Sequence, residues 1–341
     1  MRKYFILCLM CLISLMGCAH VEEEVIPPIV EPEVIPPSPL ESIDLSLKPN
    51  EAGQIMVLMY HAISLEEDVW ARTPDNFRKD LQTLYDQGYR PISLLDFALG
   101  SINTEAGKTP VVITFDDGRI NNFNYLEDGT MDPESAVGIL VNFHEAHPDF
   151  PLEATFFLTD DNFFGQRDSI GKKLNYLIEQ GMDVGNHTQT HVNFTKVTTQ
   201  EEIEREIGGQ AQAIEKWLSS DYTVNTMALT YGSRPQEDAL KAYLATGSYE
   251  GIPYENKVLL NVGSNPSPSP YQLTFDPLSI PRIRASELET DGLGLYDYLD
   301  VFIQYPERRF ISDGVQSIVT VPTELIDQVN IPEGYQLNPY E

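Results

Sequence analysis

From residue 54 onward the sequence alternates short apolar runs with amphipathic segments, and this alternation restricts the fold more than any other feature. The apolar runs have the length and composition of buried strands, and Thr73-Pro74-Asp75 is a typical helix start. We expect strands at 54–60, 111–115, 154–158, 226–230 and 258–262. We expect one helix to begin at 73 and others to span 133–146, 169–179 and 199–218. Such alternation predicts an α/β fold with a parallel sheet or barrel.

The first 50 residues have a different character. Residues 1–17 combine a basic start with an apolar run that is shorter than the about 20 residues of a membrane-spanning helix, which predicts a signal peptide. The run ends on Leu15-Met16-Gly17-Cys18, which resembles the lipobox of bacterial lipoproteins and implies a lipid on Cys18. The alternative is an ordinary signal peptide with an incidental cysteine. Residues 18–50 are rich in Pro and Glu, which is typical of an extended tether, and the domain is expected at 51–341.

Cysteine usage and net charge restrict the kind of site and partner. All three cysteines lie at or before Cys18, so we expect neither a disulfide nor a cysteine metal ligand in the domain. The chain has 52 acidic and 22 basic residues and a formal net charge of -30. This argues against a nucleic-acid partner, because phosphate binding needs clustered Lys and Arg. We interpret the acidity as a source of solubility and expect a monomer.

Two adjacent carboxylates stand at the end of an expected buried strand. Asp116 and Asp117 follow the apolar run 111–115, where unpartnered charges are costly to bury. His187 and His191 follow another strand-like segment, and one Asp with two His can hold a catalytic metal that keeps an open position. The second Asp would then be free to act as a base. A structural turn at Gly118 is the alternative. His144 and His147 form a rival pair, which we interpret as a solvated helix end.

The motifs and their order resemble the polysaccharide deacetylases of the NodB-homology group, carbohydrate esterase family four. The T-F-D-D-G motif of that family is present unchanged at 114–118, and its H-[S/T]-x-x-H motif is matched at 187–191. Its P-Y-G motif becomes Thr230-Tyr231-Gly232 here. The resemblance implies a distorted (β/α) barrel that forms a single catalytic domain. It also implies a divalent metal on Asp117, His187 and His191, most often zinc, with cobalt, manganese and nickel as alternatives. Asp116 would be the base, and the Tyr231 N–H would face the oxyanion.

Two residues of the common family pattern, a histidine and an arginine, are missing from their usual positions in this sequence. The general acid is usually a histidine near the C-terminal end, but this chain has no histidine after His191. His61, at the end of the first expected strand, resembles the acid of the rearranged branch typified by poly-N-acetylglucosamine deacetylases. It could instead be a hydrogen-bonded histidine without chemistry. No arginine precedes the Thr230 motif, so Arg234 and Arg282 are candidates to orient the base, and Arg282 is preferred.

The function implied by this resemblance is metal-dependent removal of acetyl groups from an N-acetylglucosamine-type polysaccharide, with release of acetate. The expected partners are an acetylated glycan polymer and a bacterial membrane, reached through the lipid on Cys18. The protein would be exported and would face the cell envelope or the exterior. Two alternatives stay open: an esterase that acts on O-acetyl groups of a polysaccharide, and a glycan-binding lipoprotein with weak or no turnover.

Overall fold

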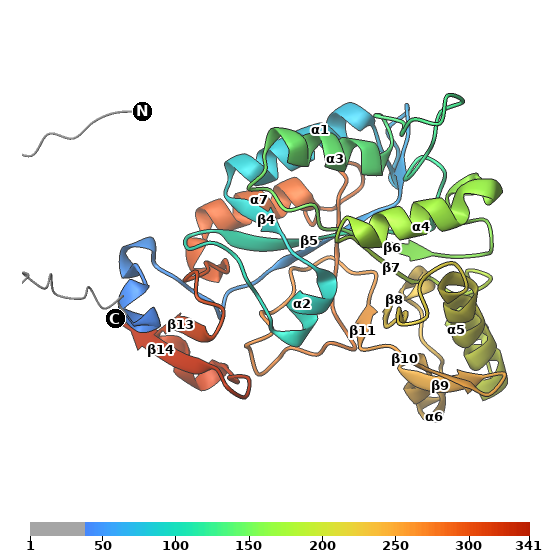
Figure 1. Cartoon of the computed structure of the whole chain (residues 1–341). Helices are drawn as coiled ribbons and strands as arrows, with labels where there is room; N and C mark the ends of the chain where they lie inside the picture. Colours follow the sequence, from blue (N-terminus) through green and yellow to red (C-terminus); the bar gives the residue numbers. More distant parts are fainter. Residues whose placement is uncertain (1–37) are drawn as a thin grey trace, which may run out of the picture. The chain divides into compact units, whose positions relative to one another are not determined.

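An eight-stranded parallel sheet organises the computed structural model, and its strands run in the order β11-β8-β7-β6-β5-β1-β12, with β4 also paired to β5 (Figure 1). The strands are β1 (Met56–Tyr60), β4 (Tyr89–Pro91), β5 (Thr109–Phe115), β6 (Thr155–Leu158), β7 (Asp183–Asn186), β8 (Thr226–Ala228), β11 (Val258–Leu260) and β12 (Ile283–Arg284). Every strand pair in this sheet is parallel. The predicted α/β fold of the distorted (β/α) barrel type is therefore confirmed.

The two ends of the sheet approach each other through the segment 280–284. On one side of the segment, Ile280 pairs with β11, where its N–H donates to the Leu259 carbonyl at 3.0 Å. On the other side, Ile283 in β12 is in register with Leu58 in β1. Arg282 lies between these two pairings and is fully buried. Closure of the curled sheet thus places one arginine inside it.

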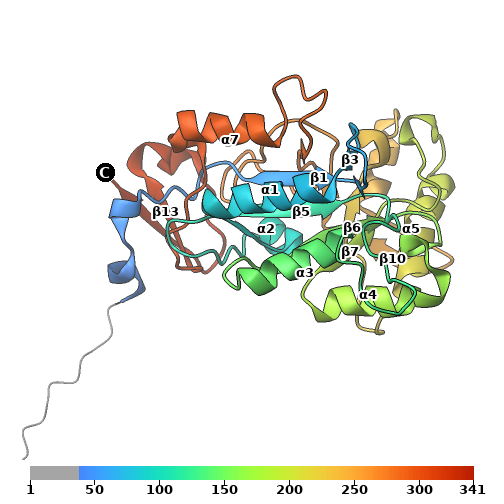
Figure 2. The ribbon, with the colours of Figure 1, turned by 90° about the horizontal axis from the view of Figure 1, so that it is seen from above.

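Helices cover the sheet, and α1, α3, α4 and α7 lie on one of its faces (Figure 2). The helices are α1 (Pro74–Asp86), α2 (Leu94–Leu99), α3 (Ala136–Ala146), α4 (Ile170–Glu179), α5 (Gln200–Glu215), α6 (Asp238–Lys241) and α7 (Leu295–Gln304). Alternate side chains of the strands enter two different cores. In β5, Val111 and Ile113 join the core beneath the helices, whereas Val112 joins the core inside the curled sheet. By this alternation Asp116, four residues after Val112, also faces the interior.

The structure describes residues 38–341, and these form one unit. The expected signal peptide, Cys18 and the tether up to residue 37 lie outside the described residues. Two short 3-10 helices, Pro39–Ser42 and Leu45–Leu47, precede the expected domain start at 51. Asn50 is already buried and pairs with Ile311. Within residues 38–341, no helix combines the length and the apolar character required to span a membrane.

Several expected boundaries were wrong by a few residues. The helix expected from 133 begins at Ala136, because the Ser135 hydroxyl caps it by accepting from the Gly138 N–H. The helix expected at 199–218 ends at Glu215, and the strand expected to reach 230 ends at Ala228. Sequence reasoning also missed several elements: α2, α6, α7, β4, β12 and the small pairs β2–β3 (Ala62–Ile63, Ala71–Arg72), β9–β10 (Thr246–Tyr249, Ile252–Glu255) and β13–β14 (Ile318–Pro322, Gln336–Tyr340).

Candidate active site

Asp116 lies directly after β5 and is bound on both carboxylate oxygens by one arginine. Arg282 Nη1 donates to Oδ1 and Nη2 donates to Oδ2, each at 2.8 Å. Both side chains are buried, with relative exposures of 0% for Arg282 and 1% for Asp116. Arg282 is held in turn by the Asn261 carbonyl, to which its Nε donates at 2.9 Å. This bidentate contact fixes the plane of the Asp116 carboxylate as well as its charge.

The surroundings of Asp116 keep it ionised despite its burial. Burial alone would raise the pKa of this carboxyl group. The positive charge and hydrogen bonds of Arg282, with the His187 and His61 rings, instead lower the pKa of Asp116 to about 2. The alternative candidate, Arg234, donates to Asn261 and to the Leu278 carbonyl. Of the two arginines named from the sequence, it is Arg282 that contacts Asp116.

Asp117 faces the two histidines of the second motif. Its Oδ1 lies 3.6 Å from His187 Nε2 and 3.4 Å from His191 Nε2. Asp117 and His191 both adopt left-handed backbone conformations, with φ of 73° and 52°. Such conformations cost a non-glycine residue of order 1–3 kcal/mol, and they persist where the surrounding structure enforces them. Here they turn the carboxylate and the imidazole toward the same point.

The donor set fits a divalent metal. Asp117, His187 and His191 each offer one ligand atom, these atoms lie within 4.8 Å of one another, and this is the one such group among residues 38–341. The His187 Nδ1 lies 2.8 Å from the Ala228 carbonyl, which leaves Nε2 free to face the site. Burial lowers the pKa of His187 and so favours the neutral imidazole that a metal requires. One carboxylate with two imidazoles is a known catalytic zinc set.

His61 approaches Asp116 from β1. Its Nε2 lies 3.9 Å from Asp116 Oδ2, and its ring packs against Trp70 with centroids 4.8 Å apart. Burial lowers the pKa of His61, and the negative charges of Asp116 and Asp117 partly offset that effect. His61 thus lies beside Asp116 at a separation longer than a direct hydrogen bond. It reaches the site from the end of β1, whereas Asp117, His187 and His191 come from the loops after β5 and β7.

Tyr231 packs against His191. Its backbone has a φ of 57°, the residue is 64% exposed, and its ring meets His191 edge to face with centroids 4.7 Å apart.

The rival pair, His144 and His147, is not simply solvated. His147 packs between the rings of Tyr85 and Phe143, so that part of the sequence interpretation was wrong.

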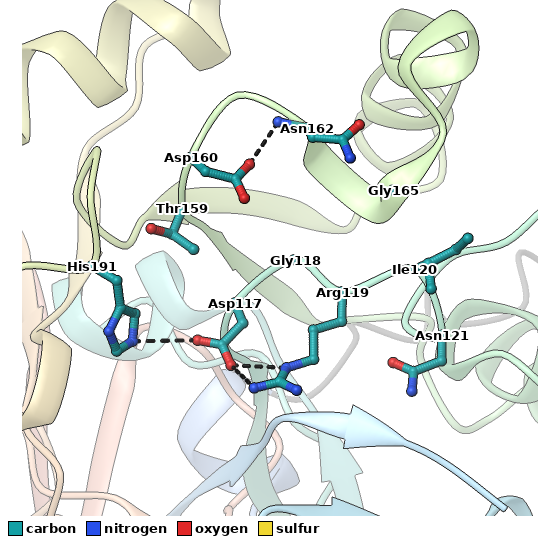
Figure 3. Close-up of a pocket in the computed structure, with 10 residues that line it drawn as sticks. All are labelled: Asp117, Gly118, Arg119, Ile120, Asn121, Thr159, Asp160, Asn162, Gly165 and His191. Atoms are coloured by element: carbon teal, nitrogen blue, oxygen red, sulfur yellow. Dashed lines mark hydrogen bonds and ion pairs between the residues drawn. The ribbon is translucent and has the colours of Figure 1, made fainter.

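A cavity of about 610 Å³ opens beside Asp117 and His191 (Figure 3). Its other lining residues come mainly from the loops after β5 and β6: Gly118, Arg119, Ile120, Asn121, Thr159, Asp160, Asn162 and Gly165. Arg119 donates to Asp117 Oδ2 from Nε at 3.0 Å and from Nη2 at 2.8 Å. Sequence reasoning missed Arg119 and Trp70. The position of Arg119 directly after the T-F-D-D-G motif was the available signal for the first.

A known protein family matches the middle part of the chain. Residues 103–249 match the family model described as Polysaccharide deacetylase. This match covers somewhat less than half of the chain and makes that segment similar to the polysaccharide deacetylases. The matched segment contains Asp116, Asp117, His187, His191 and Tyr231. By contrast, the residues that contact Asp116 from β1 and from the segment 280–284 lie outside it. No curated protein sequence matches the chain significantly.

Solved structures share the fold of this chain at low sequence identity. The Streptococcus pyogenes deacetylase PplD, solved in complex with acetate, has a TM-score of 0.52 at 20% identity, over 72% of this chain and 97% of its own. BC0361, a polysaccharide deacetylase from Bacillus cereus, has a TM-score of 0.51 at 19% identity, over 72% and 68%. BA0330 from Bacillus anthracis, itself a proposed polysaccharide deacetylase, has a TM-score of 0.50 at 21% identity, over 68% of this chain and 64% of its own. The alignment thus spans slightly less than two thirds of BA0330.

Proposed function

We propose that this protein is a metal-dependent deacetylase that hydrolyses the acetamide groups of an N-acetylglucosamine-type polysaccharide and releases acetate. The observation that carries the proposal is the different environment of two adjacent aspartates. Asp116 accepts one hydrogen bond from Arg282 on each of its oxygens. Asp117 instead turns one oxygen toward the Nε2 atoms of both His187 and His191. The two carboxylates are thereby suited to separate tasks, one as a base and one as a ligand.

Asp117, His187 and His191 would hold the metal, with zinc as the preferred ion and cobalt, manganese or nickel as alternatives. A bound divalent ion would polarise the acetyl oxygen as a Lewis acid and lower the pKa of a water molecule. The protein's own contribution is the preset geometry of the ligand set. The Ala228 carbonyl orients His187, and Arg119 occupies Asp117 Oδ2 so that Oδ1 faces the histidines.

Asp116 is the proposed general base. To accept a proton it must be ionised in the resting protein, and the Arg282 contact satisfies this by holding its pKa at about 2. The same contact fixes the carboxylate in one orientation, so little reorganisation is needed when the water attacks. A positioned base of this kind contributes typically about 10²–10⁴-fold to the rate.

His61 is the proposed general acid, and the Tyr231 N–H is the proposed oxyanion donor. Breaking the C–N bond requires a proton on the departing nitrogen, since an amide anion is a poor leaving group. Because burial lowers the pKa of His61, its protonated ring gives up a proton more readily than a free imidazolium does. Among the described residues, the only other histidine within 4 Å of the Asp116 carboxylate is the proposed ligand His187, at 3.9 Å. One proton is thus taken by Asp116 and one is supplied by His61.

Two exposed aromatic rings flank the reaction centre and suit a polymeric sugar substrate. Trp70 packs on His61 and is 44% exposed, and Tyr231 packs on His191 and is 64% exposed. Such rings offer flat apolar faces without closing the site. The cavity beside Asp117 leaves room for neighbouring sugars.

The capture of PplD with acetate is consistent with release of the same product here. Export and lipid attachment at Cys18 would place the site at the cell envelope.

Acetate release tests the proposal directly. The purified protein is stripped of metal by a chelator and then assayed with and without added zinc on chitin oligomers, β-1,6-linked poly-N-acetylglucosamine and acetylated xylan. We expect zinc-dependent acetate release from an N-acetylglucosamine polymer and none from Asp117→Ala, which should also fail to retain zinc. Cleavage of acetylated xylan alone would make the protein an O-acetyl esterase. Zinc binding and glycan binding without acetate from any polymer would contradict the catalytic proposal.

A further inference from the structure

Two hydroxyl side chains join the turn that carries Tyr231 to the segment that carries His191. The Thr230 hydroxyl donates to the carbonyl of Val192, the residue next to His191. The Ser233 hydroxyl accepts from the Phe194 N–H at 2.8 Å and donates to the Thr230 carbonyl at 2.8 Å. Both residues are buried. The hydroxyls thus connect two loops that leave different strands, β7 and β8.

The linked segments are those that most need an external hold. His191 and Tyr231 both have left-handed backbones, with φ of 52° and 57°, and their rings meet at 4.7 Å with an interplanar angle of 81°. From the other side, the buried Glu206 on α5 accepts from the Thr190 N–H at 2.9 Å. The His191 segment is therefore held by Glu206 from α5 and by the two hydroxyls from the Tyr231 turn.

Proline, which stands at this position in the family motif, has no side-chain donor and could not make the contact of Thr230. We infer that Thr230 and Ser233 are positioning residues that hold the proposed metal ligand His191 and the proposed oxyanion donor Tyr231 as one rigid unit. The inference rests on the proposed function and deepens it. Neither residue touches the reacting atoms, so both act through the backbone of His191 and Tyr231.

Thr226 provides a matched control for the effect of losing a buried hydroxyl. Like Thr230, it is a fully buried threonine, and it begins β8, the strand that leads to Thr230. Its hydroxyl has no hydrogen-bond partner in the described structure. A Thr→Val change removes a hydroxyl and conserves the shape at either position. Only at Thr230 does it also break the link to the His191 segment.

The test compares Thr230→Val, Thr230→Ser and Thr226→Val in the full protein. Zinc dissociation constants are measured by competition with a chelator, the visible spectrum of the cobalt form reports ligand geometry, and acetate release gives kcat and KM. We expect Thr230→Val to bind zinc roughly tenfold more weakly, as changes behind a metal ligand commonly do, and to alter the cobalt spectrum. Thr230→Ser keeps the hydroxyl and should resemble the wild type, and Thr226→Val should be unchanged within twofold.

Three results would overturn the inference: unchanged zinc affinity and cobalt spectrum in Thr230→Val, an equal loss in Thr226→Val, or no recovery in Thr230→Ser. If Thr230→Val does not fold, Ser233→Ala takes its place with the same expectation. Because the decisive readout is zinc affinity, a wild type that binds zinc but releases no acetate contradicts the proposed activity while the role of Thr230 is still decided by its variants.

Discussion

Two groups of acidic residues at opposite ends of the parallel strands have opposite electrostatic characters. At the carboxyl end of β5, Arg282 lowers the pKa of Asp116 to about 2 although burial alone would raise it. At the amino ends of β6 and β7, Glu153 and Asp183 lie close together. Among the described residues, no Lys, Arg or His lowers the pKa of either carboxyl group. There burial, with the nearby charges of Asp96 and Asp183, raises the pKa of Glu153 to about 7.

The comparison shows that the partner, rather than burial itself, decides the charge state of an interior carboxyl group. Asp183 is also raised above its ordinary pKa by burial, and its hydrogen bond from Tyr222 offsets this only partly. A raised pKa favours the neutral form of a carboxyl group, which suits a structural role. A lowered pKa keeps the buried Asp116 ionised at neutral pH, and only the ionised form can accept a proton. The variants below test that division, from the largest expected effect to the smallest.

The largest difference between the two groups should appear in turnover. Asp116→Asn removes the proposed base while conserving shape, and we expect acetate release to fall by about 10²–10⁴-fold. Zinc should be retained, because Asp117, His187 and His191 are intact. The control is Glu153→Gln, the same carboxyl-to-amide change at the other end of the strands, which should leave kcat within a factor of two. Equal losses in both variants would contradict the distinction between a catalytic and a structural acid.

Removing the cation should make Asp116 resemble Glu153. Arg282→Met leaves a buried carboxylate without its partner, and we expect a loss of about 3–5 kcal/mol in the free energy of unfolding, measured by denaturant titration at pH 7. The double variant Asp116→Asn with Arg282→Met should recover part of this loss, because the unpaired charge is gone. Arg234→Met is the control, since Arg234 does not contact Asp116. An unchanged stability of Arg282→Met would show that the ion pair is dispensable.

The variant His61→Ala tests whether His61, which lies beside Asp116, is the proton donor. We expect His61→Ala to lower kcat by about 10²-fold and to leave the zinc affinity unchanged, because the side chain is not part of the ligand set. His144→Ala, at a histidine remote from the site motifs in α3, should retain full turnover. If His61→Ala keeps its activity, the acid lies elsewhere, while the metal site could still be correct.

The smallest effect concerns stability and pH. The folded pKa of Glu153, about 7, exceeds the unfolded value of about 4.3, so its contribution to stability is full below pH 4 and is lost as the pH rises through 7. Allowing for solvent around this partly exposed group, the loss should be on the order of 1 kcal/mol between pH 5 and pH 8. Glu153→Gln should abolish that part of the pH dependence in denaturant titrations.

Asp116 has the opposite sign. Its folded pKa of about 2 lies below the unfolded value of about 3.9, so its contribution is present above pH 4 and is lost only as the pH falls through 2. Asp116→Asn should therefore not change the slope between pH 5 and pH 8. A slope change in Asp116→Asn and none in Glu153→Gln would reverse the comparison.

Much of the fold could be read from local sequence patterns. Five expected strands correspond to β1, β5, β6, β8 and β11, because a buried strand of a parallel sheet is a continuous apolar run. The elements that were missed are mostly short, such as the two residues of β12, or lie in the last third of the chain, such as α7. A two-residue strand has no periodicity to detect, and its identity as a strand depends entirely on its neighbour β1.

The candidate site divides in the same way. Motif spacing predicted Asp116, Asp117, His187 and His191. The family resemblance implied Tyr231 and, because no histidine follows His191, it also implied His61. Their roles stay predictions until the variants are measured. The sequence analysis preferred Arg282 over Arg234 but could show no contact with Asp116, and it offered no sign that the Thr230 hydroxyl would reach Val192. These contacts join residues of different strands, and no local pattern records which strands become neighbours.

The sequence by itself therefore determined the α/β class, the motif residues and the chemistry that they favour, because apolar runs and short motifs act within a few residues. Only the tertiary structure decided which arginine neutralises Asp116. Closure of the curled sheet inserts the segment 280–284 between β11 and β1, and this brings Arg282 to a carboxylate 166 residues away. A charge pair across such a separation exists only once the whole sheet has formed.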